Sequence, residues 1–173
     1  MEIRLTNADD VDQQLAALDG AARRACDWLA SHDGPPLDLL KSLKFEPVGF
    51  HPVTGDPLNF IEQVNQTFTY IVALKAAREI FRLHPDCGPL LLAPGAHAAQ
   101  ALDIMSEAKG LIGAETFAAV TPRNNGKLGK DLEKLSSRPE LHRYVFFASP
   151  VHPGTERLPK LEKAGVKVWS IAI

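Results

Sequence analysis

Residues 103–115, DIMSEAKGLIGAE, carry the hairpin signal that decides the fold of this chain. Ala108-Lys109-Gly110 reads as a three-residue loop that ends in glycine, the residue best able to adopt the left-handed conformation that such loops usually need. A hairpin closed there pairs position 107 with 111 and 105 with 113, and it places Asp103 opposite Glu115. Directly opposed side chains lie only about 5 Å apart, so two carboxylates repel each other unless a cation lies between them. A hard divalent cation such as Mg²⁺ would resolve that conflict.

Composition and charge set broad limits on the class of protein. The chain has 173 residues, of which 45% are hydrophobic, which is enough for one full core. The net charge of −2 predicts that any contact with nucleic acid is local rather than spread over the whole surface. The two cysteines form no CxxC motif, and no apolar run reads as a signal peptide or a membrane span. We therefore expect reduced thiols and a cytoplasmic protein.

Periodicity and turn residues predict an α/β domain preceded by a helical N-terminal extension. The extension and its connector occupy residues 1–57, and the domain occupies residues 58–173. The predicted elements are a helix over 9–31, a broken connector over 37–57, a helix over 58–83, strands over 89–93, 100–107 and 111–120, a helix to about 136 with asparagine caps before it, a strand over 142–149, a short helix over 158–164 and a last strand over 166–173.

Three carboxylates are candidates for a functional site, and each has a plainer alternative. Glu115 is the hardest to explain otherwise, because it interrupts a small, apolar run, and buried carboxylates are paired or bind metal. Asp103 can cap a turn instead. Glu62 lies on the helix face opposite the apolar stripe, a face that is ordinarily solvated, and Gln63 on its flank is a rival ligand.

A basic ridge follows the hairpin on the next predicted helix. Lys127, Lys130 and Lys134 recur at helical spacing, and Arg123 precedes them in the loop. Such a ridge can bind the phosphates of nucleic acid. The lysines alternate with acidic residues at positions 131 and 133, so a solvated helix face with internal ion pairs is the competing interpretation.

The order of elements from Leu58 onward, with carboxylates at these places, resembles the restriction-endonuclease-like superfamily of PD-(D/E)xK nucleases, whose core is αβββαβ. The resemblance covers about two thirds of the chain. The stretches FIEQVNQTFTYIVALKAA and GAETFAAVTPRNNGKLGKDLEKL are also similar to a divergent bacterial group within that fold. The resemblance implies that Glu62, Asp103 and Glu115 are catalytic ligands of one Mg²⁺ or Mn²⁺ ion.

The chain departs from the superfamily pattern at one catalytic position. The lysine that normally follows the third-strand carboxylate by two residues is replaced by Phe117, and Lys127 or Lys130 on the following helix is the available substitute. Glu107 and Lys109 also have ExK spacing, but Lys109 falls in the predicted turn, so we interpret Glu107 as a surface residue of the hairpin.

The function implied by the resemblance is metal-dependent hydrolysis of phosphodiester bonds in nucleic acid, with DNA as the expected substrate. Cleavage of both strands of a duplex with one site per chain would suggest a homodimer. Two alternatives stay open: a catalytically inactive protein of the same fold that serves as a nucleic-acid- or protein-binding module, and a structural protein with no role on nucleic acid.

Overall fold

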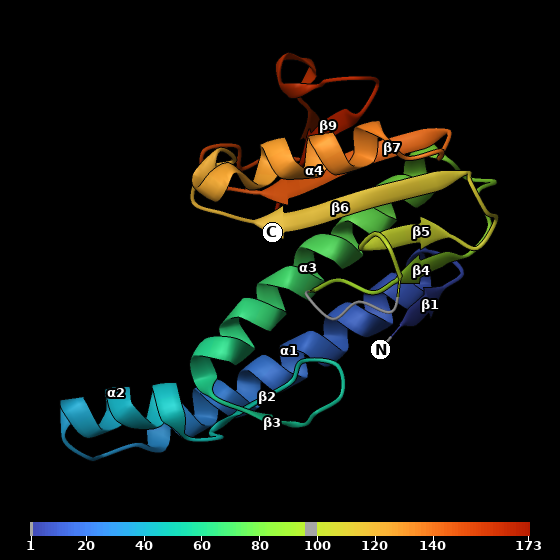
Figure 1. Ribbon diagram of the computed structural model, residues 1–173. Helices are drawn as coiled ribbons and strands as arrows, with labels where there is room; N and C mark the ends of the chain where they lie inside the picture. Colours follow the sequence, from blue (N-terminus) through green and yellow to red (C-terminus); the bar gives the residue numbers. More distant parts are fainter. Residues whose placement is uncertain (1, 96–99) are drawn as a thin grey trace. The chain divides into compact units, whose positions relative to one another are not determined.

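The computed structural model describes residues 2–95 and 100–173, apart from the side chain of Asn124. This part of the chain forms a mixed seven-stranded sheet, a two-stranded sheet and four α-helices, which establishes the predicted α/β class (Figure 1). None of its helices is long and apolar enough to cross a membrane. The helices are α1 (Ala8–Ser31), α2 (Pro36–Phe45), α3 (Phe60–Leu83) and α4 (Lys127–Ser136).

The contacts group the chain into two compact units. One unit contains the first eleven residues together with Val72–Ile173, and the other is Asp12–Ile71. Their boundaries fall inside α1 and α3. The second unit contains the short pair β2 (Gly49–Phe50) and β3 (Pro57–Leu58).

The large sheet belongs to the first unit and has the strand order β1-β4-β5-β6-β7-β9-β8. The pairs from β1 to β6 are antiparallel, β6, β7 and β9 are parallel, and β8 is antiparallel to β9. The sequence does not predict β1, whose Ile3 pairs with Leu92 of β4. The strands are β1 (Ile3–Leu5), β4 (Leu90–Leu92), β5 (Ile104–Ser106), β6 (Ile112–Ala118), β7 (His142–Ala148), β8 (Glu156–Arg157) and β9 (Lys167–Ser170).

The hairpin between β5 and β6 has the predicted register. Met105 pairs with Gly113 and Ile104 with Ala114, and Gly110 in the turn takes a φ of 75°. Left-handed backbone of this kind is accessible to glycine without steric cost. Continuation of the same register past the end of β5 assigns Asp103 to the position opposite Glu115.

Helix α4 connects the parallel strands β6 and β7 and covers one face of the sheet. Its apolar side packs into a core cluster of buried residues, Leu102, Phe117, Leu128, Leu132, Leu135, Val145, Phe147, Val166 and Val168. Figure 1 shows α4 in front of β6 and β7 and the C-terminal part of α3 behind them. The predicted order helix, three strands, helix, strand over residues 58–149 is therefore confirmed.

Three local predictions are wrong. The segment 37–57 is not a broken connector throughout, because it contains most of α2 and the β2–β3 pair. The segment 158–164 is not an α-helix, because only Pro159–Leu161 forms a short 3₁₀ turn and the backbone N–H of Leu158 donates to Val168 O, 2.8 Å away. Asparagine does not cap α4: the N-cap is Gly126, with a φ of 65° and no side-chain hydrogen bond.

Candidate functional site

Glu115 lies in the middle of β6 and is only 3% exposed, which confirms that it is a buried carboxylate. Its Oε1 accepts a hydrogen bond from Lys134 Nζ at 2.6 Å, and its Oε2 lies 3.8 Å from Lys127 Nζ. Burial raises the pKa of Glu115, and the charges of Asp103 and Asp131 raise it further, whereas the bond to Lys134 lowers it. The two lysines of α4 thus provide the positive charge next to this carboxylate.

Asp103 reaches the same region from the other side of the hairpin. Its Oδ2 accepts hydrogen bonds from the Thr116 N–H at 2.8 Å and from Thr116 Oγ1 at 2.9 Å. These two bonds hold the Asp103 carboxylate beside the residue that follows Glu115. The negative charge of Asp103 contributes to the raised pKa of Glu115, as expected for neighbouring carboxylates.

Asp131 of α4 is a third carboxylate at this place, and it is not among the site residues predicted from the sequence. Its Oδ1 accepts a hydrogen bond from Lys127 Nζ at 2.6 Å, and the residue is 2% exposed. Within the part of the chain that the structure describes, its Oδ2 is buried and has no hydrogen-bond partner. Burial raises the pKa of Asp131, and the bond to Lys127 opposes that shift. A usable signal exists in the sequence, because Asp131 shares a helix face with the buried leucines three residues before it and four residues after it.

The charged cluster consists of Asp103, Glu115, Asp131, Lys127 and Lys134, and when all five are ionised it has one more negative than positive charge. Burial lowers the pKa of Lys127, but the hydrogen bond to Asp131 and the nearby carboxylates raise it more, so the net shift is upward. Lys127 therefore stays an ammonium ion at neutral pH. It can stabilise negative charge on a ligand, and it is a poor proton acceptor.

The oxygen donors of this cluster fit a hard divalent cation. Mg²⁺ is commonly bound by one or two carboxylates, with water and phosphate oxygens completing its shell. Asp103 and Glu115 provide carboxylates of that kind. Among residues 2–95 and 100–173, no three or more histidine, cysteine, aspartate or glutamate side chains are grouped so as to hold a metal ion. A site at Asp103 and Glu115 would therefore depend on water or phosphate for most of its ligands.

Glu62 and Gln63 belong to the second unit. The Oε1 of Glu62 accepts a hydrogen bond from Gln66 Nε2 at 2.8 Å, and its role as a third metal ligand stays a prediction. Gln63 is 3% exposed, and its side chain joins two backbone groups: Oε1 accepts from Phe50 N at 2.8 Å, and Nε2 donates to Ala21 O at 3.0 Å. Gln63 is thus a structural residue, which removes it as a rival ligand.

Phe117 occupies a core position. It is 8% exposed, and its ring stacks on that of Phe147 with a centroid distance of 5.6 Å. A lysine at position 117 would therefore displace part of the core. The other ExK candidate lies at the surface, because Lys109 is exposed in the hairpin turn and Glu107 is exposed and pairs with Arg4 at 2.9 Å.

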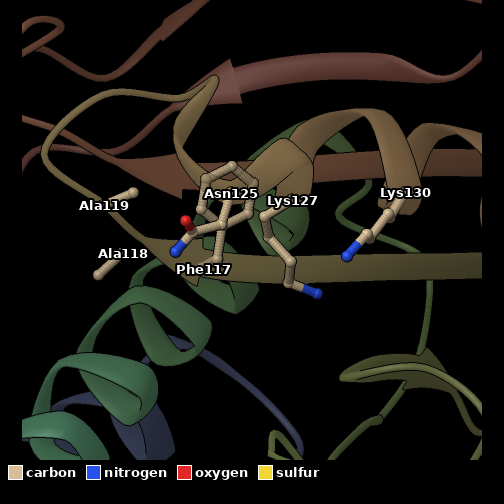
Figure 2. Close-up of a pocket in the computed structure, with 6 residues that line it drawn as sticks. All are labelled: Phe117, Ala118, Ala119, Asn125, Lys127 and Lys130. Carbon is tan, nitrogen blue, oxygen red and sulfur yellow. The ribbon is translucent and has the colours of Figure 1, made fainter.

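A pocket of about 360 Å³ opens where β6 ends and α4 begins (Figure 2). It is lined by Phe117, Ala118, Ala119, Asn125, Lys127 and Lys130. Lys130 is exposed and makes no ion pair with the described residues, whereas Lys134, from the same predicted basic ridge, is engaged with Glu115. Arg123 is exposed in the loop before α4 and does not line the pocket.

Comparisons with protein-family models, with curated proteins and with solved structures gave no match.

Proposed function

We propose that this protein is a divergent metal-dependent nuclease with a restriction-endonuclease-like core, and that it hydrolyses phosphodiester bonds in nucleic acid, with DNA as the first substrate to test. One observation carries the proposal: α4 brings the ammonium groups of Lys127 and Lys134 to the buried carboxylate of Glu115, which is influenced by the charge of Asp103. A cation thus stands beside the strand carboxylate although position 117 is a phenylalanine.

In this proposal each residue of the site has a separate role. Asp103 and Glu115 would hold Mg²⁺ or Mn²⁺, and the resemblance implies Glu62 as a further ligand. Such an ion polarises a phosphodiester and lowers the pKa of a bound water. Lys127 stabilises the negative charge that develops on the phosphate, and Lys130 binds a phosphate at the adjoining pocket.

The basic residues at the edge of the site would bind the phosphates of the substrate and take no part in the reaction itself. Arg123 and Lys130 are exposed cations from which phosphates would displace counterions. Lys134 belongs to the same predicted phosphate-binding ridge, and its bond to Glu115 gives it a second role, which is to neutralise that carboxylate. A homodimer with two such sites would allow cleavage of both strands of a duplex.

The competing function is a binding module that has the fold but no hydrolytic activity, and one observation favours it. Glu115 and Asp131 are each paired with a lysine at 2.6 Å, so much of the negative charge is already neutralised without a metal. Buried carboxylates need such partners whether or not they take part in catalysis.

Cleavage of labelled single- and double-stranded DNA and RNA, in Mg²⁺ and in Mn²⁺, tests the two functions. We expect cleavage that is lost in EDTA, in Asp103→Asn and in Lys127→Ala, and retained in the surface control Lys109→Ala. Asp103→Asn is preferred to alanine because an asparagine oxygen can still accept the two bonds from Thr116. Glu62→Gln in the same assay checks the predicted third ligand. If the folded wild type cleaves none of these substrates, the binding module becomes the better interpretation.

A further inference from the structure

The pocket beside the charged cluster combines three chemical features that a simple phosphate site would not need. Lys127 and Lys130 provide positive charge, Phe117, Ala118 and Ala119 provide an apolar wall, and Asn125 provides an amide. Figure 2 shows the two lysine side chains extending from α4 on one side of the Phe117 ring, with the Asn125 amide on the other side of that ring, towards Ala118 and Ala119.

Two of the polar groups are available to a ligand. Lys130 forms no ion pair and the Asn125 amide forms no hydrogen bond with any residue that the structure describes. Asn125 has a φ of 54°, so its backbone is held in the left-handed region where asparagine is tolerated better than most residues. Lys127 is shared, since its ammonium group also binds Asp131.

We propose that this pocket binds one unpaired nucleotide, with its phosphate at Lys127 and Lys130 and its base between the apolar wall and the Asn125 amide, and that the substrate is therefore single-stranded nucleic acid. The inference rests on the proposed function in taking the ligand to be nucleic acid. An asparagine amide offers both a donor and an acceptor, which is the pattern that base edges present.

The size of the pocket supports a single nucleotide. A volume of about 360 Å³ is at the lower end of the range for small-molecule sites, which matches one base with its sugar and phosphate. A duplex could fill it only by extruding a base, and that step costs unstacking and unpairing energy. We therefore expect a single strand to bind at least about tenfold more tightly than the duplex of the same sequence.

Fluorescence anisotropy in EDTA measures this preference without cleavage. The probes are a short labelled single strand and its duplex, titrated with the full chain over a series of salt concentrations. We expect Lys130→Ala to weaken single-strand binding about fivefold to tenfold and to reduce the magnitude of the salt slope by about 0.7, the value for one phosphate contact on a single strand. Lys109→Ala, which removes an exposed lysine from the hairpin turn, should match the wild type.

Competition with a mononucleotide and with inorganic phosphate separates a nucleotide pocket from a phosphate site. Asn125→Gly deletes the amide and keeps the left-handed backbone, so it should weaken competition by the mononucleotide about threefold and leave competition by phosphate unchanged. Phosphate that competes as well as the mononucleotide would overturn the inference. So would a duplex that binds as tightly as the single strand, or a Lys130→Ala variant that behaves like Lys109→Ala.

The outcome for the pocket can be distinguished from the outcome for the nuclease. A single-strand preference with the expected variant effects, but no cleavage in Mg²⁺ or Mn²⁺, would support the nucleotide pocket and reject the hydrolase. Metal-dependent cleavage with equal binding of duplex and single strand would support the hydrolase and reject the nucleotide pocket.

Discussion

Replacement of Lys134 with alanine would leave the buried carboxylate of Glu115 without its shortest ion pair. The bond that is lost is 2.6 Å long and joins a carboxylate whose side chain is 4% exposed to a lysine whose side chain is 47% exposed. Hydrogen bonds to charged groups contribute about 1.5–3 kcal/mol to stability. Because Lys134 is half exposed and Lys127 stays 3.8 Å from the other carboxylate oxygen, we expect a loss near the lower end, about 2 kcal/mol in the free energy of unfolding.

The loss should depend on pH in a direction that follows from burial. Burial raises the pKa of Glu115 in the folded state, so stability falls as pH rises from the ordinary glutamate pKa through the higher pKa of the folded state. Without Lys134 that pKa is higher still, and the window of falling stability extends to higher pH. The difference between wild type and Lys134→Ala should therefore be largest at neutral pH and should shrink in acid, where Glu115 is protonated in both proteins.

Urea denaturation at neutral and acidic pH measures this effect, and a double-mutant cycle isolates it. In a Glu115→Gln background the Lys134→Ala change should cost less than about 0.5 kcal/mol, because no buried charge is left without a partner. Lys130→Ala, one turn earlier on the exposed side of α4, is the matched control for helix propensity. Equal costs of Lys134→Ala in the two backgrounds would refute the reasoning, as would a cost in wild type no larger than that of Lys130→Ala.

Two further predictions concern stability away from the ion pairs. Gly129→Ala should raise the free energy of unfolding by about 0.5–1 kcal/mol, because a Cβ there meets nothing within 4 Å and alanine favours the helix. Gly126→Ala should lower the free energy of unfolding, because the backbone at this position has a φ of 65° that alanine adopts only with strain. Urea denaturation checks both changes. Burial lowers the pKa values of His84 and His142, and the charge of Lys167 lowers both further. The folded state therefore binds fewer protons than the unfolded state, so the melting temperature should fall as pH drops through the ordinary histidine pKa. His142→Asn should flatten that dependence, and an unchanged pH profile would contradict this account.

Local signals in the sequence are sufficient to predict the hairpin and the burial of Glu115. The register depends on the length of the turn and on a glycine at the position where φ is 75°, and both are visible in the residues themselves. Likewise a glutamate inside an apolar run can be recognised as buried without knowledge of what surrounds it. The burial of Phe117 agrees with its place in the same apolar run.

The partners of the charged residues could not be predicted in the same way. Glu115 and Lys134 are 19 residues apart, and their contact depends on how α4 is rotated over the sheet. The alternation of Asp131 with lysines suggests a solvated face as one interpretation, whereas its spacing from the buried leucines of α4 places it on the opposite face. The strand β1 has only three residues, too few to show a period, and its pairing with Leu92 depends on tertiary structure.

Phe117 belongs to the pocket wall and to the core at the same time, and this has a consequence for directed evolution of the site. A library that varies Phe117 would alter the shape of the pocket and remove the ring that stacks on Phe147, so most of its members should be poorly folded. Asn125 and Lys130 are exposed, and their substitution leaves that stacking intact. New ligand preferences should therefore arise by changes at these two rim positions, with the aromatic wall kept constant.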